Sequence, residues 1–343
     1  MAAFLGEETD HIPVMPILHS GLPGLFHTTM GDYFGTASCM ANTIIRGWQV
    51  FSYDGVQLSL GVTGEAQALG AEIMQPEHDA PILKNRLLDT IFDEQVNLLD
   101  MLDPLRNIDA SSGGRMPLYY EAVGQVASVI GKHTFVLSLL RGPLLAASQL
   151  CGVETLLIAM IEQPERVNAV LDFTTDLVIS LARWLLNSGA HGLMLGEATC
   201  SPNFISPGMY RDFVHPRHSR IINACHKQGW PVTGLHICGN IEPIFHDIVS
   251  TGVDMLDVDY QVSAQKAKIL NAGRIVCRGN LDPSSVFRFG TPQTVRKATS
   301  ELMREVGNNH KWILSSGCDI PPGTPEDNIR AFADTGSALP ALT

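Results

Sequence analysis

The fold of this chain is indicated most clearly by Pro231-Val-Thr-Gly-Leu-His-Ile-Cys-Gly-Asn240. The run from Val232 to Leu235 is short and apolar, which predicts a buried strand, and Gly239-Asn240 ends it. His236 and Cys238 stand two residues apart, so their side chains leave the same face of an extended backbone. The stretch therefore predicts a strand whose C-terminal end presents an imidazole and a thiol.

The same alternation of strand and helix extends in both directions from this stretch. Strands are expected over residues 12–18, 51–58, 133–140, 192–196, 232–235, 255–259, 275–278 and 312–314. Helices are expected over residues 29–47, 64–71, 81–105, 119–129, 144–160, 165–188, 206–227, 241–251, 264–272 and 291–306, with a last helix starting near residue 324. Eight strands, each followed by helical sequence, predict an α/β fold of the (β/α)8 or TIM-barrel type, forming a single domain over residues 1–343.

Composition and charge narrow the class of protein. Hydrophobic residues make up 45% of the 343 residues and the net charge is −12, which disfavours nucleic acid or an anionic membrane as a partner. The seven cysteines are odd in number and irregularly spaced, which argues against a disulfide framework and for a reducing compartment. The N-terminus lacks a signal-peptide pattern, and no apolar run approaches the ~20 residues of a membrane span. We therefore expect a soluble, cytoplasmic protein.

A third candidate ligand lies far along the chain from His236 and Cys238. Cys318 follows the short apolar run Trp312-Ile-Leu314 and again stands just past an expected strand end. One imidazole and two thiols suit a zinc ion held between neighbouring strand ends, and three protein ligands leave a fourth position open, as in catalytic zinc sites. The simpler alternative is two buried cysteines and a core histidine.

Other polar residues fall at or near expected strand ends, where barrel active sites are built. Glu197 and Asp259 are candidate catalytic residues, although each could instead cap a helix. His19, Arg141 and Asn280 are candidate substrate-binding residues. The alternatives are a structural ion pair for Arg141 and a turn position for Asn280.

Four phrases of the sequence resemble a known superfamily. They are Gly234-Leu-His-Ile-Cys-Gly-Asn240, Thr251-Gly-Val-Asp-Met-Leu-Asp-Val-Asp259, Arg278-Gly-Asn-Leu-Asp-Pro283 and Leu314-Ser-Ser-Gly-Cys-Asp-Ile-Pro321. All resemble the uroporphyrinogen decarboxylase superfamily, and in particular its zinc-dependent corrinoid methyltransferase branch, typified by methylcobamide:coenzyme M methyltransferases. The resemblance implies that His236, Cys238 and Cys318 are zinc ligands. The decarboxylases carry an arginine-rich segment near the N-terminus, where this chain has His19-Ser-Gly-Leu-Pro-Gly-Leu25, and this departure counts against decarboxylation.

The resemblance implies a reaction of one-carbon metabolism. A methyl group would move between methylcobalamin, carried by a partner corrinoid protein, and a small thiol such as coenzyme M, through a zinc-bound thiolate. Asp257, Asp259 or Glu197 could orient His236 or occupy the fourth zinc position. An anionic thiol would need a cation, for which Arg141 and Arg278 are the candidates. A homodimer is compatible with these expectations.

Three alternatives remain open at this point. Zinc could instead activate a methylated ether, thioether or amine for transfer to the corrinoid, as in the substrate:corrinoid component of demethylases. A tetrapyrrole decarboxylase would predict no zinc and an arginine-lined cleft. A binding module without turnover would predict a closed zinc site with four protein ligands.

Overall fold

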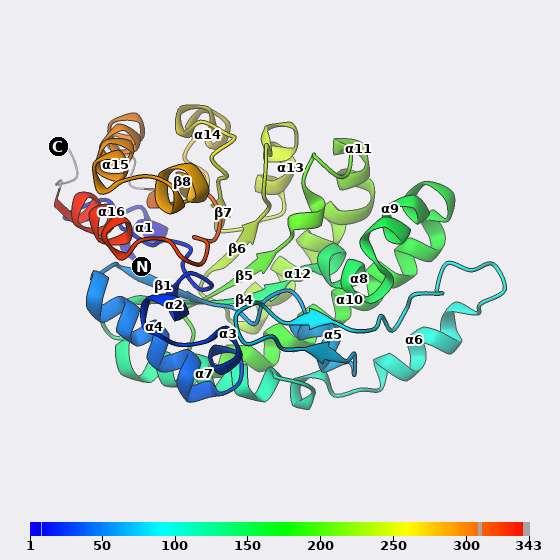
Figure 1. Cartoon of the computed structure of the whole chain (residues 1–343). Helices are drawn as coiled ribbons and strands as arrows, with labels where there is room; N and C mark the ends of the chain where they lie inside the picture. The colour runs from blue at the N-terminus through cyan, green and yellow to red at the C-terminus, as the bar shows by residue number, and fades with distance from the viewer. Residues whose placement is uncertain (8, 308–310, 339–343) are drawn as a thin grey trace.

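A computed structural model describes residues 1–7, 9–307 and 311–338 as a curled parallel sheet surrounded by helices (Figure 1). Within these residues the sheet has seven strands in the order β1-β4-β5-β6-β7-β8-β9, and all neighbouring pairs are parallel. The strands are β1 (Gly55–Leu58), β4 (Phe135–Arg141), β5 (Gly192–Gly196), β6 (Thr233–His236), β7 (Met255–Asp257), β8 (Val276–Leu281) and β9 (Trp312–Ser316). A separate small hairpin pairs β2 (Ile73–Met74) with β3 (Ile82–Leu83).

Helices alternate with the strands of the main sheet along the chain, and the longer ones pack against its outer face. They are α1 (Ala2–Leu5), α2 (Leu22–Leu25), α3 (Met30–Tyr33), α4 (Ala37–Phe51), α5 (Gly64–Ala68), α6 (Leu98–Arg106), α7 (Met116–Ile130), α8 (Pro143–Cys151), α9 (Val153–Glu162), α10 (Pro164–Leu185), α11 (Pro207–Met209), α12 (His215–Gln228), α13 (Phe245–Ser250), α14 (Ala264–Asn271), α15 (Pro292–Val306) and α16 (Glu326–Ala338). The α/β class and the parallel sheet agree with the sequence prediction, and seven of the eight expected strands are strands of this sheet.

The first expected strand, residues 12–18, forms only an isolated parallel bridge between Val14 and Leu314 of β9. Backbone hydrogen bonds join this segment to both edges of the sheet, since Met15 N donates to Leu314 O at 2.9 Å and Asp54 N donates to Val14 O at 2.7 Å. Pro13 and Pro16 have no N–H group, so a regular ladder cannot form along this segment. The segment lies between β1 and β9 without completing a regular eighth strand.

The prediction of a helix over residues 81–105 was wrong for residues 81–97. The structure has β3 and irregular backbone before α6 begins at Leu98. The Arg166 guanidinium on α10 donates hydrogen bonds to the carbonyl oxygens of Ile91, Asp93 and Val96 at 2.6–3.2 Å. The apolar spacing that suggested a helix belongs to a loop, because a distant arginine satisfies carbonyl groups that a helix would have satisfied internally.

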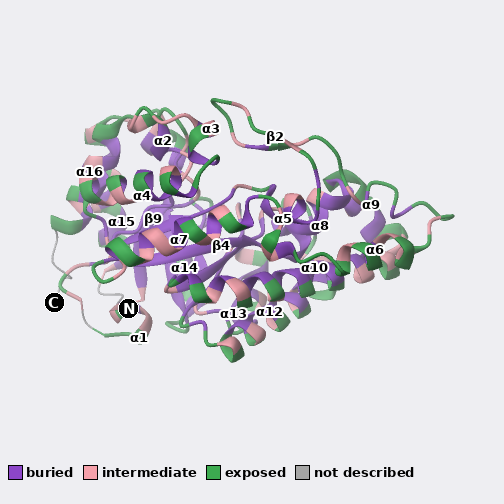
Figure 2. Cartoon of the chain, turned by 90° about the horizontal axis from the view of Figure 1, so that it is seen from below, coloured by how far each residue is buried: buried purple, intermediate pink, exposed green. Residues whose placement is uncertain are grey.

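The strands of the main sheet are buried inside the molecule (Figure 2), and their two faces contribute to different apolar clusters. Outward-facing residues such as Leu140, Leu195 and Leu235 join the large core beneath the helices. Inward-facing residues alternate with these along each strand. At the N-terminal ends of the strands the inner face is an apolar cluster of Met15, Phe135, Leu137, Leu139, Met194, Val232, Met255, Val276 and Ile313. At the C-terminal ends, the same alternation presents Gln57, Arg141, His236, Asp257 and Arg278.

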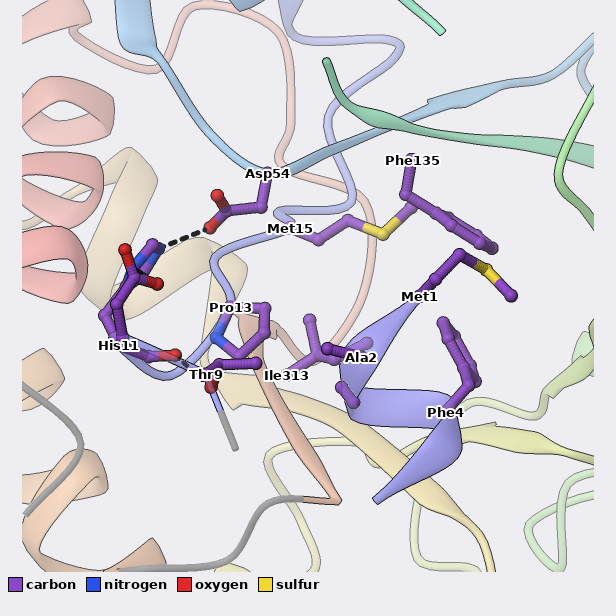
Figure 3. A pocket seen from close by; sticks show the side chains of 12 residues that line it. Met1, Ala2, Phe4, Thr9, His11, Pro13, Met15, Asp54, Phe135 and Ile313 are labelled. Carbon is purple, nitrogen blue, oxygen red and sulfur yellow. Dashed lines mark hydrogen bonds and ion pairs between the residues drawn. The ribbon is translucent and has the colours of Figure 1, made fainter. Parts of the chain in front are cut away.

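The N-terminal end of the sheet has a cavity of about 150 Å³ beside α1 (Figure 3). Phe4 stacks on Phe135 there, with ring centroids 5.2 Å apart. His11 Nε2 lies 3.0 Å from Asp54 Oδ2 and Nδ1 lies 2.8 Å from Asp10 Oδ1. The hydrogen bond to Asp54 is the main reason that the pKa of His11 rises to about 9, against a smaller opposing effect of burial. This end of the molecule ties the N-terminal segment to the base of the sheet.

The sequence predicted no membrane-spanning segment, and among the described residues no single helix has the length and apolar character needed to cross a bilayer. Helices α8 and α9 meet that criterion by length and composition only when combined, and they are bent by 107° at the break between them.

Candidate metal centre

A second cavity, of about 310 Å³, lies at the C-terminal ends of the strands. It is lined by Ile17, His19, Ser20, Met30, Phe34, Gln57, Gly61, Val62, Ala80, Leu139, Arg141, Leu145, Gly196, Glu197, Ala198, His236, Cys238, Cys318 and Asp319. Six of the eight residues singled out in the sequence line this cavity, and Asp259 and Asn280 do not. Most of the remaining lining is apolar, so the cavity offers a small number of polar groups on an apolar wall.

His236, Cys238 and Cys318 form what we call the open cluster. Their ligand atoms lie within 4.8 Å of one another. The two sulfur atoms are 3.8 Å apart, and His236 Nε2 lies 3.2 Å from Cys238 Sγ and 3.7 Å from Cys318 Sγ. Two thiolates about 2.3 Å from a tetrahedral zinc ion would be separated by roughly 3.8 Å, and a thiolate and an imidazole nitrogen by roughly 3.5 Å. The residues present therefore fit a zinc ion in both chemistry and spacing.

The His236 ring is held from behind by a buried ion pair. Its Nδ1 lies 2.8 Å from Asp257 Oδ2, which leaves Nε2 directed at the two thiols. Arg278 donates from Nε to Asp257 Oδ1 and from Nη2 to Oδ2, each at 2.7 Å. Burial opposes the ionisation of Asp257, but the charge of Arg278 prevails and lowers the pKa of the carboxyl. Histidines that bind zinc commonly donate their other ring N–H to a carboxylate, which fixes the orientation of the ring.

The three side chains of the open cluster perturb one another's ionisation. The hydrogen bond with Cys318 lowers the pKa of Cys238, and the same bond together with burial raises the pKa of Cys318. Burial opposes the charge of His236, but hydrogen bonds to Asp257 and Cys318 outweigh it and raise its pKa to about 10. Without metal, these contacts thus favour ionisation of Cys238 over Cys318 and protonation of His236.

Asp259 and Asn280 shape the loops that follow β6 and β7 instead of facing the cavity. Asp259 accepts hydrogen bonds from the backbone N–H of Gly239 at 2.9 Å and of Gln261 at 3.0 Å. Asn280 donates from Nδ2 to the Val262 carbonyl at 2.5 Å. Asp259 fixes the turn directly after Cys238, where Gly239 has a φ of +87°. In this geometry both side chains position loops beside the cavity, and the catalytic role of Asp259 and the substrate-binding role of Asn280 stay predictions.

Glu197 belongs to another group, Glu197, Cys200 and His218, which we call the closed cluster. Its three ligand atoms also lie within 4.8 Å, and all three residues are fully buried. The Glu197 oxygens accept from the N–H groups of Leu144 and Leu145 at the start of α8, both at 2.9 Å. Glu197 lines the cavity, but its carboxylate is engaged by the N-terminus of a helix, an electrostatically favourable position.

The remaining members of the closed cluster are also satisfied. His218 Nε2 lies 3.3 Å from Glu197 Oε1, and His218 Nδ1 lies 3.1 Å from the Tyr210 hydroxyl. Burial, with a further contribution from Glu197, raises the pKa of the Cys200 thiol well above its ordinary value. No lone pair of His218 is left for a metal ion.

His19 stands at the wall of the cavity beside Cys318. Its Nδ1 lies 3.1 Å from Asp319 Oδ2, and its backbone N–H donates to Asp319 Oδ1 at 3.2 Å. Ser20 also donates to Asp319 through its hydroxyl. Burial would raise the pKa of Asp319, but His19 and these hydrogen bonds lower it. The sequence placed His19 correctly at the cavity and missed Asp319, although Asp319 directly follows a predicted ligand.

Arg141 is the arginine that reaches the cavity. Its backbone N–H donates to Glu65 Oε1 at 2.7 Å, and its guanidinium donates to Ser59 Oγ at 2.8 Å and to Gly61 O at 2.9 Å. Burial is the largest effect on the pair, lowering the pKa of Arg141 and raising that of Glu65. Within residues 1–7, 9–307 and 311–338, Arg141 Nη1 has no hydrogen-bond partner, so it remains available to a ligand.

Known proteins resemble this chain along most of its length. The family model described as uroporphyrinogen decarboxylase (URO-D) matches residues 1–338. The methylcobamide:CoM methyltransferase MtaA of Methanosarcina barkeri is 26% identical over 342 residues, covering 97% of this chain and 94% of its own. A uroporphyrinogen decarboxylase of Prochlorococcus marinus (strain MIT 9313) is 26% identical over 307 residues, covering 87% of this chain and 82% of its own.

A solved structure shares the fold. The methyltransferase from Methanosarcina mazei superposes with a TM-score of 0.85 at 23% identity, covering 98% of this chain and 96% of its own. At that level of identity the likeness concerns the fold alone. Sequence identity does not by itself separate the two activities named among the relatives, so the choice between them depends on the side chains of the cavity.

Proposed function

This chain belongs to the uroporphyrinogen decarboxylase family, and from that premise we propose that it is a zinc-dependent methyltransferase. It moves a methyl group between methylcobalamin on a partner corrinoid protein and a small thiol, the class of reaction named for its MtaA relative. The observation that carries the proposal is the open cluster, where one imidazole and two thiols converge at zinc-ligand spacing on the wall of a cavity.

His236, Cys238 and Cys318 would hold the ion, and each has a defined part. Cys238 provides the more acidic thiol and Cys318 the partner that stabilises its thiolate. His236 presents Nε2 because Asp257 engages Nδ1. A zinc ion held here would deprotonate a bound thiol and keep its sulfur nucleophilic toward the methyl group.

The lining of the cavity favours a small substrate with an anionic group. Arg141 lies on a largely apolar wall, and its Nη1 has no hydrogen-bond partner among the described residues. Arg278, the other candidate cation, is fully buried and engaged by Asp257, so it is not the substrate's counter-ion. We therefore assign the recognition of an anionic thiol such as coenzyme M to Arg141, with His19 and Asp319 beside it.

A decarboxylase acting on a tetrapyrrole fits this cavity less well. Such a substrate carries several carboxylates, and Arg141 is the one arginine among the described residues that line the cavity. The opposite direction of methyl transfer has a specific observation in its favour. Met30, Phe34 and Val62 give the cavity an apolar wall, which suits a methylated ether or thioether activated by the metal.

For the whole chain we also propose a type of barrel, a single domain and a cellular location. We propose that residues 12–18 occupy the first strand position of a (β/α)8 barrel, because their backbone bonds to both edges of the sheet, and that residues 1–343 form one domain. The seven cysteines include no disulfide among the described residues, which supports a cytoplasmic location. A homodimer remains compatible with the chain.

The test begins with the wild-type protein. We expect about one zinc ion per chain by mass spectrometry, and transfer of the methyl group of methylcobalamin to a panel of thiols. Transfer should be lost when a chelator removes the metal and return when zinc is restored. The reverse assay, with reduced cobalamin and methylated ethers, thioethers or amines, decides the direction. Wild-type protein without zinc, or transfer unaffected by its removal, would contradict the proposal.

A further inference from the structure

A continuous line of buried side chains joins two residues of the cavity wall. Gln57 on β1 and His236 on β6 both line the cavity. Arg278 Nη2 donates to Gln57 Oε1 at 2.6 Å and to Asp257 Oδ2 at 2.7 Å, and Asp257 in turn holds His236 Nδ1 at 2.8 Å. Gln57, Asp257 and Arg278 are at most 3% exposed. The metal ligand and a polar group of the substrate wall are therefore held by one arginine.

Arginine fixes the orientation of the Gln57 amide. A guanidinium group donates hydrogen bonds and accepts none, so the side-chain oxygen of Gln57 must face Arg278. The amide nitrogen then occupies the other position of the same carboxamide. Within the described part of the chain this nitrogen has no hydrogen-bond partner, and Gln57 lines the cavity. It is a donor available to an acceptor atom of a bound molecule.

The same arginine fixes the tautomer of the metal ligand. Arg278 donates to both oxygens of Asp257, which therefore acts as a carboxylate and accepts from every neighbour. His236 must donate its Nδ1 proton to Asp257, so the lone pair of a neutral ring lies on Nε2. Nε2 is the atom directed at Cys238 and Cys318.

Stability alone does not explain the buried pair. Placing Arg278 and Asp257 in the interior requires both charges to be removed from water, and well-packed apolar residues are often equal or better for stability. The apolar residues Val276 and Met255 occupy the inward positions of the same strands two residues earlier. The change from apolar to charged residues occurs at the level of the cavity, which points to a role in the site.

We propose that Arg278 is a positioning residue for both halves of the site: the metal half, where it holds His236 through Asp257, and the substrate half, where it holds Gln57. We further propose that Gln57 is a specificity residue that donates a hydrogen bond to an anionic oxygen of the thiol substrate. The inference about Gln57 rests on the function proposed above. The Gln57 amide would bind the anionic group of this thiol together with Arg141, which lines the same cavity.

The substrate half is tested with two thiols that differ only in the acceptor group. The probes are 2-mercaptoethanesulfonate and ethanethiol, assayed with methylcobalamin and zinc-loaded protein. Gln57→Leu removes the donor, and Gln57→Glu keeps an acceptor for Arg278 while removing the donor. Both should raise KM for the sulfonate roughly 10- to 100-fold, with kcat and the KM for ethanethiol little changed. Gln125→Leu, at a partly exposed position on α7, is the matched control.

The metal half is tested by zinc affinity, measured by competition with a chromophoric chelator. Arg278→Lys keeps the charge but cannot hold Gln57 and both Asp257 oxygens together. It should lower zinc affinity about 10- to 100-fold and also raise KM for the sulfonate. Arg106→Lys, on the exposed helix α6, is the control. If Arg278→Lys does not fold, the pair Arg278→Met with Asp257→Asn tests the same loss without a buried charge.

The outcomes separate this inference from the proposed function. Wild-type protein that binds no zinc and transfers no methyl group overturns both. Wild-type protein that does both, with an unchanged sulfonate KM in the Gln57 variants, overturns the role of Gln57. Unchanged zinc affinity in a folded Arg278 variant overturns the role of Arg278. If no Arg278 variant folds, the selective change in KM at Gln57 decides the proposal.

Discussion

Two clusters in the described part of this chain each place three ligand atoms within 4.8 Å, but the hydrogen-bond partners of these atoms differ between the clusters. In the open cluster, His236 Nε2 and two sulfur atoms face one another at the cavity wall, and no backbone N–H among the described residues donates to them. In the closed cluster, Glu197 is engaged by two backbone N–H groups and His218 by hydrogen bonds at both ring nitrogens. Proximity of ligand types is thus a weak sign of a metal site, and unsatisfied lone pairs are the stronger one.

The largest expected effect follows from removing one thiol in each cluster. Cys318→Ala should lower zinc affinity by more than the roughly hundredfold typical of a lost outer-shell contact, because a direct ligand is removed. Cys200→Ala should leave the zinc content unchanged. Metal content after dialysis against a chelator gives the comparison, and Cys39→Ala, a half-buried thiol on α4, is the control. Loss of zinc in Cys200→Ala would reverse the assignment of the two clusters.

The open cluster should also show a strong competition between zinc and protons. The pKa of His236 is about 10 and that of Cys318 is raised, so both carry protons at pH 9, whereas the pKa of Cys238 is lowered. Zinc must displace the protons of His236 and Cys318, so about two protons should be released per ion at pH 9. Affinity therefore rises with pH, by up to roughly a hundredfold per unit.

Calorimetry in buffers of different ionisation enthalpy counts these protons. With ordinary pKa values of about 6.5 for histidine and 8.5 for cysteine, the number would fall below one by pH 9. A value near zero at pH 9 would mean that the contacts within the open cluster do not hold in solution. The Cys200→Ala variant should release the same number of protons as wild type.

The sequence predicted the open cluster because its three residues each follow an apolar strand. Strands over 192–196, 232–235 and 312–314 were correct because buried parallel strands are short apolar runs with recognisable ends. The closed cluster could not be predicted in the same way. Glu197 follows a strand in the same manner as Cys238, but its partners at Leu144, Leu145 and His218 come from two other helices. Nothing local to Glu197 indicates which of these environments it will have.

Arg278 is a second residue whose environment could not be predicted from the local sequence. It is the last residue of the expected strand 275–278, and the sequence made it a candidate cation for an anionic thiol. In the structure, Asp257 and Gln57 accept hydrogen bonds from Nε and Nη2, and both lie on other strands. Among the described residues, the third nitrogen, Nη1, is buried without a partner. Similarly, prolines within 12–18 were visible in the sequence, but the contacts of that segment with both Leu314 and Asp54 depend on how the sheet curls.

The closed cluster should contribute to the free energy of unfolding, whereas the open cluster should determine the affinity for zinc. Glu197→Ala leaves the N–H groups of Leu144 and Leu145 and the ring of His218 without a buried acceptor. The free energy of unfolding should fall by about 3–4 kcal/mol, measured by urea denaturation. Zinc affinity of the folded variant should be unchanged. Glu301→Ala on the solvent side of α15 should stay within about 0.5 kcal/mol of wild type.

The smallest expected effect tests how tightly the closed cluster is packed. Gly142 precedes α8, and a Cβ atom added there would lie 2.4 Å from Cγ and from Oε1 of Glu197. Gly142→Ala should therefore push the carboxylate away from the helix N-terminus and lower the free energy of unfolding by about 1–3 kcal/mol. Gly124→Ala in α7 is the matched control, because its nearest contact, Ser188 O, is 3.6 Å away. That change should stabilise the helix by up to about 1 kcal/mol.

The difference in the free energy of unfolding between Gly142→Ala and Gly124→Ala shows whether the contacts of Glu197 with α8 stabilise the fold. If Gly142→Ala is as stable as Gly124→Ala, Glu197 can move without loss, and its contacts with α8 are not what stabilises this part of the fold. The carboxylate would then be free to turn toward the cavity beside Leu145, and a direct role for Glu197 in the reaction would return. If only Gly142→Ala is destabilised while zinc affinity is retained, Glu197 acts by holding α8, and with it Arg141, in place beside the cavity.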